Sequence, residues 1–185
     1  FKENRVEFAK RPIILYCGGW LPIKGVAAIQ EALRPILIKY PDYLLRLVGV
    51  GESFKKEQYF PGHLLNRVEV VPYIRDREKL IDLFTECRFF IFPSLADSFG
   101  LVVAEAMYCG CIAIVSGTGF GYSLLHKKEA WILEEPTALL LEEALRSLIE
   151  DEALCNQMRL GGRQRVQGLQ WSVYQSRLAD VLAEL

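Results

Sequence analysis

Histidine is scarce in this sequence, its opposite charges nearly cancel, and it contains no long apolar run. Its two histidines, His63 and His126, lie far apart and its cysteines are not spaced as C-x-x-C, so we expect no metal site. With 22 basic against 23 acidic residues, the net charge of −1 gives no basic field for non-specific nucleic-acid binding. The longest apolar stretches, such as Phe89–Phe92, are far shorter than the ~20 residues of a membrane span.

We expect no secretory targeting signal in the first residues of the sequence. Residues 1–11 are charged and have no long apolar run, and the chain does not begin with Met, so we expect a fragment or processed piece of a longer protein. The number of cysteines, 5, is odd, and several lie inside apolar runs, where a free thiol behaves as a small apolar side chain. We therefore expect the protein to reside in the reducing cytoplasm.

Apolar residues are plentiful and follow an alternating pattern. At 51% hydrophobic content, the 185 residues are too apolar to be disordered, and we expect residues 1–185 to form a single domain. Short apolar segments predict strands at Ile13–Cys17, Leu44–Val50, Arg67–Val71, Phe89–Phe92, Cys111–Val115 and Ala130–Leu133. Helical spacing predicts helices at Lys24–Tyr40, Ser53–Leu65, Asp76–Cys87 and Leu101–Cys109, and from Pro136 to the end, where Trp171–Leu185 forms a final amphipathic helix.

Two features of this pattern decide the predicted fold. The strands are continuous apolar runs, which is typical of parallel sheets covered on both faces. Their alternation with helices predicts an open, doubly wound, Rossmann-like α/β domain with extra helices at its carboxyl end. Within the first helix, Pro35 predicts a kink or an early stop.

Ligands of such folds bind beyond the carboxyl ends of the strands. Four loops follow predicted strands there: Gly18–Gly25, Gly49–Glu52, Pro72–Asp76 and Pro93–Gly100. The second begins like a G-x-G-x-x-G fingerprint but has Phe54 at its last position, and the first has Lys-Gly where a P-loop has Gly-Lys, so neither motif is present.

The first loop still has the features of an anion site. Gly18 and Gly19 let the backbone approach a ligand closely, and Lys24 lies at the start of the next helix, where anions are favoured. The alternative is an ordinary turn with a solvated lysine.

The fourth loop leads into a helix with one charged residue. Asp97 or Ser98 is either a ligand-binding residue or simply the N-cap of this helix. Glu105 is the only charge in Leu101–Met107, which is otherwise apolar and so expected to be buried. Helical side chains lean toward the N-terminus, so Glu105 can reach a diol such as a ribose attached to a phosphate at the helix start. The alternative is a structural glutamate bonded to a neighbouring loop.

These residues resemble a known family. Asp97-x7-Glu105 around Ser98-Phe99-Gly100, followed by Cys109-Gly110, is similar to the E-x7-E segment of retaining GT-B glycosyltransferases of the "glycosyl transferases group 1" type. Gly18–Gly25, the segment Tyr40–Gly51 and the pair Trp171-Ser172 also resemble that family, in the same order. The resemblance covers nearly the whole chain and corresponds to the C-terminal, donor-binding domain of a two-domain enzyme.

The resemblance implies a role for each candidate residue. Lys24, with the amides around Phe99, Gly100 and Leu101, would hold the diphosphate of a UDP- or GDP-linked sugar. Glu105 would bind the ribose, Asp97 would face the transferred sugar, and Tyr73 and Ile74 would meet the nucleobase. It further implies transfer with retention, no cofactor, no essential metal, and an N-terminal acceptor domain that is absent here. The final helix, Trp171–Leu185, would face that domain, and peripheral membrane contact would go through it.

The sequence also departs from the family pattern. Gly19 stands where the family has an arginine, Asp97 replaces a glutamate, and Tyr122-Ser123 replaces a Pro-Glu pair, with Arg75 or Arg77 as replacement cations. These departures leave a second hypothesis open, a degenerate, non-catalytic binding or interaction module. A third, a nucleotide-dependent sugar epimerase, fits the Asp97-x7-Glu105 context less well. Trp20 and Tyr122 are either sugar-stacking platforms or core aromatic residues.

Overall fold

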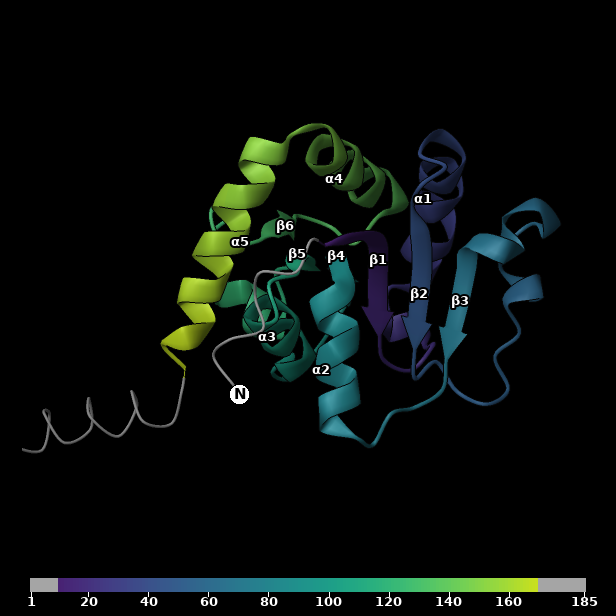
Figure 1. Cartoon of the computed structure of the whole chain (residues 1–185), viewed down its shortest axis with the longest axis horizontal. Coiled ribbons are helices and arrows are strands. Elements are labelled where there is room, and N and C mark those ends of the chain that lie inside the picture. Colours follow the sequence, from purple (N-terminus) through teal and green to yellow (C-terminus); the bar gives the residue numbers. More distant parts are fainter. Residues whose placement is uncertain (1–9, 170–185) are drawn as a thin grey trace, which may run out of the picture.

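The computed structural model describes residues 10–169, which form an α/β domain around one parallel sheet (Figure 1). The strands lie in the order β3-β2-β1-β4-β5-β6, and every neighbouring pair is parallel. Their bounds are β1 Arg11–Cys17, β2 Leu44–Val48, β3 Val68–Val71, β4 Cys87–Phe92, β5 Ile112–Ser116 and β6 Trp131–Leu133. This order confirms the predicted doubly wound sheet and puts the switch point between β1 and β4.

Helices connect and cover the strands. The helices are α1 Val26–Lys39, α2 Arg77–Glu86, α3 Leu101–Tyr108, α4 Ala138–Glu150 and α5 Glu152–Gln167. α1 packs against α4, α3 packs against both α2 and α5, and α4 also contacts α5. The core lies between them and the sheet: Ile13–Tyr16 of β1 and Phe89–Ile91 of β4 are at most 1% exposed. The continuous apolar runs of the sequence are therefore strands covered on both faces.

The first predicted helix differs from the structure in its extent. α1 begins at Val26 rather than Lys24, because a 3-10 turn ends at Lys24, and it does not stop early at Pro35. Ile36 and Leu37 just beyond Pro35 are fully buried. Burying two such side chains contributes ~3–6 kcal/mol, which offsets the ~3 kcal/mol cost of an internal proline.

The predicted helix over Ser53–Leu65 is wrong. This segment forms the 3-10 helices Lys56–Gln58 and Gly62–Arg67 with a loop between them. Pro61 precedes the second of them and prevents one continuous helix, although Phe60 and Leu64 are buried in the core. The helical region after Pro136 is divided into α4 and α5 at Asp151, which caps α5. The predicted helix Trp171–Leu185 lies outside the described residues.

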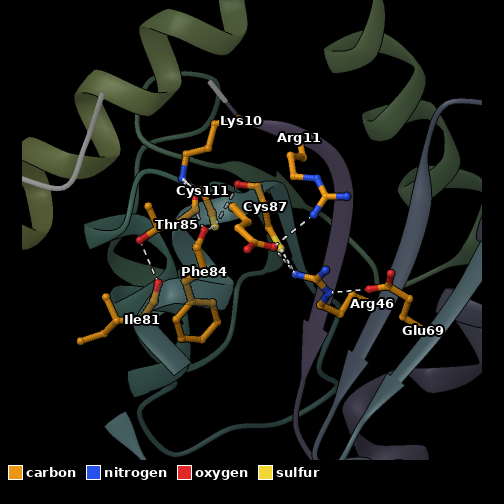
Figure 2. Close-up of polar contacts among 10 residues, drawn as sticks. Lys10, Arg11, Arg46, Glu69, Ile81, Phe84, Thr85, Cys87 and Cys111 are labelled. Carbon is orange, nitrogen blue, oxygen red and sulfur yellow. Dashed lines mark hydrogen bonds and ion pairs between the residues drawn. The ribbon is translucent and has the colours of Figure 1, made fainter. Parts of the chain in front are cut away.

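Lys10 joins the carboxyl ends of two helices at the amino edge of the sheet. Its Nζ donates to the carbonyls of Thr85 at 2.8 Å and Cys109 at 2.6 Å, and to that of Phe84 at 3.4 Å (Figure 2 shows the contacts at the end of α2). Burial lowers the pKa of Lys10, but three carbonyl acceptors match the three protons of its ammonium group. The contact connects the ends of α2 and α3 opposite the carboxyl edge of the sheet.

A second polar cluster neutralises a buried arginine on β2. Arg46 is 6% exposed, and its guanidinium donates to Glu69 at 2.7 Å and Glu86 at 3.0 Å (Figure 2). Arg11 lies 3.5 Å from Glu86 as well. The two carboxylates offset the cost of desolvating Arg46, so this cluster needs no ligand to account for it.

Candidate functional site

The loop after β1 brings Lys24 to the switch point. Lys24 ends a 3-10 turn, and Gly25 follows in the left-handed region with φ of 69°. A Cβ on Gly25 would lie 1.8 Å from the carbonyl oxygen of Pro93. The amide of Leu95 donates to the carbonyl of Ile23 at 2.9 Å, so the loops after β1 and β4 are joined through their backbones.

Lys24 and Asp97 form an ion pair across these joined loops. Lys24 Nζ lies 3.4 Å from Asp97 Oδ1 and 5.2 Å from the ring centroid of Phe92. Their side chains are 23% and 15% exposed, so water screens this pair less than an open surface pair. The structure therefore puts two residues predicted to bind different parts of a donor in direct contact.

The amino end of α3 points to the same edge of the sheet. Its N-cap is Gly100, with φ of 76°, and no side chain among residues 10–169 caps it. The interpretation of Asp97 or Ser98 as the N-cap is therefore wrong; Asp97 Oδ1 accepts from the Ser98 amide at 2.9 Å instead. The uncapped amides at the start of α3, from Leu101 onward, form an arrangement that favours anions.

The segment after β5 supports this helix end. The Phe120 amide donates to the Phe99 carbonyl, and the two rings stack with centroids 6.2 Å apart. Gly119 has φ of 53°, and a Cβ there would lie 2.9 Å from the Phe99 oxygen. Neither Gly119 nor Phe120 is among the sequence candidates. The Gly-Thr-Gly triplet at 117–119, directly after a predicted strand, is the signal for this close approach.

Glu105 lies one turn into α3 and is paired with an arginine. Its Oε1 is 3.5 Å from Nη2 of Arg77, the first residue of α2, and its side chain is 32% exposed. The expectation that this helix is buried all round is wrong, because α3 buries only one face and Leu101 is 66% exposed at the carboxyl edge. The pKa of Cys17 is raised to about 11, chiefly by burial and further by the Glu105 charge.

The glycines after β1 are held by their backbones. The Gly18 amide donates to the carbonyl of Val48 at 2.9 Å, and the Gly19 carbonyl accepts from the hydroxyl of Tyr16 at 2.7 Å. These contacts extend the β1–β2 pairing past the ends of the strands, so the turn before Lys24 is fixed.

Tyr73 and Ile74 lie at the same edge, after β3. Tyr73 is 77% exposed, and a Cβ on Gly49 would lie 3.7 Å from its ring. Ile74 is half-buried against the core. They follow β3, whereas Lys24 follows β1, and β2 lies between these two strands in the sheet.

The two aromatic candidates differ in their surroundings. Trp20 packs against the rings of Tyr16, Phe54 and Tyr59 at centroid distances of 5.8, 5.0 and 5.4 Å, which favours the interpretation as a packing residue. Tyr122 is 85% exposed.

The five cysteines are free thiols. Among residues 10–169 no group of three or more His, Cys, Asp or Glu residues is arranged to hold a metal ion. None of the helices in this part of the chain has the length and apolar character of a membrane span.

Comparison with known proteins identifies the family. Residues 1–165 match the family model described as "Glycosyl transferases group 1". The chain belongs to this family. The uncharacterized glycosyltransferase YqgM of Bacillus subtilis (strain 168) is 27% identical over 159 residues, which cover 84% of this group 1 chain and 44% of the relative. D-inositol 3-phosphate glycosyltransferase 1 of Catenulispora acidiphila is 28% identical over 181 residues, which cover 91% of this chain and 43% of the relative.

Solved structures share the fold. Sucrose-phosphate synthase from Thermosynechococcus elongatus has a TM-score of 0.75 and 26% identity, covering 94% of this group 1 chain and 45% of its own. The C-terminal domain of a glycosyl transferase group 1 family protein from Francisella tularensis has a TM-score of 0.76 and 22% identity. The match covers 89% of this chain and 92% of the Francisella domain. Anabaena HepE, solved in complex with UDP and glucose, has a TM-score of 0.72 and 20% identity. The match covers 96% of this chain and 49% of HepE. The chain spans under half the length of the curated relatives above.

Proposed function

We propose that this chain is the donor-binding half of a retaining glycosyltransferase, which binds a UDP- or GDP-linked sugar for transfer to an acceptor. The observation that carries the proposal is the ion pair that joins Lys24, in the loop after β1, to Asp97, just before α3. α3 itself provides an uncapped amino end and, one turn further on, the Glu105 carboxylate. Cation, helix end and hydroxyl acceptor are the groups that a nucleoside diphosphate requires.

Each candidate residue has a role in this proposal. Lys24 and the amides from Phe99 to Leu101 bind the diphosphate, with the backbone of Gly18 and Gly19 close to it. Glu105 accepts hydrogen bonds from the ribose hydroxyls. Asp97, beside Ser98, faces the transferred sugar, whereas Tyr73 and Ile74 meet the base.

The chemistry follows from charge. When the bond between sugar and diphosphate breaks, negative charge develops on the leaving phosphate oxygen. Lys24 and the amino end of α3 stabilise that charge without reorganising, which lowers the barrier. We propose that the site needs neither a resident metal nor a cofactor, and that the sugar keeps its anomeric configuration.

The small share of each relative that this chain covers supports a second half of the enzyme, outside this chain. The curated relatives are more than twice as long as the matched region, and the Francisella C-terminal domain is matched over 92% of its length. We propose that an N-terminal domain binds the acceptor, faces residues 171–185 and makes any peripheral membrane contact. The cytoplasm remains our predicted location. HepE, bound to UDP and glucose, supports the choice of donor.

One observation favours a second candidate, a non-catalytic binding module. Position 19 is glycine and Asp97 already engages Lys24 at 3.4 Å, so the predicted diphosphate site has little free positive charge. This candidate predicts no saturable nucleotide binding. The glycosyltransferase family match favours transfer over the epimerase hypothesis.

Thermal protection separates these candidates. We expect UDP or GDP at millimolar concentration to raise the Tm of the 185-residue chain, because diphosphate and ribose contacts both come from this chain. Free glucose or mannose is expected to leave the Tm unchanged. Equal protection by nucleotide and free sugar would contradict the proposal, and the absence of protection by any nucleotide supports the binding module.

A further inference from the structure

The two carboxylates of the candidate donor site are each paired with a cation. Asp97 pairs with Lys24 at 3.4 Å, and Glu105 pairs with Arg77 at 3.5 Å. The carboxylates belong to one segment, the loop before α3 and α3 itself, whereas the cations come from the loop after β1 and the start of α2. The four formal charges sum to zero.

The position of Arg77 is set by the cap of its helix. Asp76 is the N-cap of α2, as predicted, and its Oδ1 accepts from the amides of Glu78 at 3.0 Å and Lys79 at 3.4 Å. Arg77 therefore leaves the first turn of α2 next to α3. Its side chain is 68% exposed, so it can change partner with little desolvation cost.

We propose that Arg77 is a second cation for the donor diphosphate and that donor binding exchanges the partners of both ion pairs. This inference rests on the proposed function of the site. A diphosphate brings at least two negative charges, and Lys24 carries only one positive charge. Arg77, released from Glu105, supplies the second. Glu105 then accepts from the ribose hydroxyls and Asp97 accepts from the hydroxyls of the sugar.

The exchange determines the class of ligand that binds well. Inorganic pyrophosphate attracts both cations but leaves Asp97 and Glu105 unpaired beside additional negative charge. A free nucleoside offers hydroxyls to Glu105, but it brings no phosphate to pair with Arg77 once Arg77 leaves Glu105. A glycosylated nucleoside diphosphate provides partners for all four groups. The paired charges therefore make the site selective for phosphate and hydroxyl groups in one molecule.

Titration calorimetry with two probes tests this exchange. UDP and inorganic pyrophosphate are titrated into the 185-residue chain and into Arg77→Gln, Glu105→Gln and the double variant. Lys79→Gln is the matched control, because Lys79 lies on the same turn of α2, is 76% exposed and carries the same charge. Circular dichroism melting confirms that each variant is folded.

The proposal predicts opposite effects of Glu105→Gln on the two probes. UDP binding weakens about tenfold because the ribose acceptor loses its charge, whereas pyrophosphate binding strengthens several-fold because Arg77 is released. Arg77→Gln weakens both probes about tenfold relative to Lys79→Gln. In the double variant, the gain in pyrophosphate affinity disappears.

Two results would overturn the inference while leaving the proposed function intact. One is that Arg77→Gln binds UDP and pyrophosphate as tightly as Lys79→Gln does. The other is that Glu105→Gln weakens or leaves unchanged the binding of pyrophosphate. If the unaltered chain binds neither probe, the proposed function fails and the inference fails with it.

Discussion

Glu105 is the residue on which the proposed donor site depends most. It is the only charged residue of α3, and helical geometry leans its side chain toward the amino end of the helix, where a phosphate would bind. Its Oε1 lies 3.5 Å from Nη2 of Arg77, the first residue of α2. The helices α2 and α3 therefore meet at this carboxylate.

Substituting Glu105 by glutamine should weaken nucleotide binding without unfolding the chain. Glutamine keeps the volume but removes the charge, and a hydrogen bond to a charged group contributes ~1.5–3 kcal/mol. Because the side chain is 32% exposed, we expect the lower end, about a tenfold rise in the Kd for UDP. Calorimetry measures the Kd and thermal melting the stability. Loss of stability with unchanged affinity per folded molecule would show that Glu105 is structural.

Sequence patterns mark Lys24, Asp97 and Glu105 as candidates, through a strand, a glycine-rich loop and one charge in an apolar helix. Their roles stay predictions, and the structure brings Lys24 and Asp97 into contact. The Arg77–Glu105 pair joins residues 28 positions apart on different helices, so no local spacing indicates it. The partial exposure of Glu105 was missed for a similar reason, because composition does not show which face of α3 is left uncovered.

At the scale of elements, the site depends on how two loops are joined. The loops after β1 and β4 meet where Gly25 lies against Pro93, and the side chain of Ser94, fully buried, lies 3.1 Å from the Ile23 carbonyl. Lys24 adjoins this junction. At the opposite edge, Lys10 joins the ends of α2 and α3. The helices that carry Arg77 and Glu105 are therefore connected at their far ends.

Gly25→Ala should destabilise the chain through this junction. Alanine in the left-handed region costs ~1–2 kcal/mol, and its Cβ overlaps the Pro93 carbonyl oxygen, for a total of about 2–4 kcal/mol. Gly62→Ala is the control, because a Cβ there meets nothing within 4 Å. Urea unfolding should show a lower free energy for Gly25→Ala and a change within about 0.5 kcal/mol for the control. Equal stability of the two variants would contradict the close approach of the loops.

The elements themselves were largely predictable from the sequence. The six strands were found because each is short and mostly apolar, with single charges such as Arg46 in β2 and Glu69 in β3, and central strands buried on both faces favour that composition. Ser53–Leu65 failed as a helix because Pro61 and Gly62 interrupt it, although Phe60 and Leu64 are buried in the core. The strand order and the loop junction depend on contacts between distant segments, which no local pattern records.

At the scale of the whole molecule, the sheet brings the functional loops to one edge. The order β3-β2-β1-β4-β5-β6 sets the loops after β1 and β4 beside each other at the switch point. The edge also exposes apolar side chains, with Leu95 at 59% and Phe99 at 51%. This is the face on which we propose that the acceptor domain lies.

The 185-residue chain should show no sugar transfer, even when it binds nucleotide tightly. In our proposal the N-terminal domain positions the acceptor, and positioning contributes ~7–11 kcal/mol to such reactions. Slow hydrolysis of the donor is the most activity expected. An assay with labelled nucleotide-sugar and added acceptors measures this, and adding the N-terminal half should restore transfer. Transfer by the chain alone would mean that the acceptor site lies within it.

A crystal structure of the chain soaked with UDP is the decisive test of the proposed donor site. We expect the diphosphate between Lys24 and the amino end of α3, with the ribose hydroxyls within hydrogen-bond distance of Glu105. A nucleotide bound elsewhere, or with its ribose directed away from Glu105, would contradict the proposed donor site.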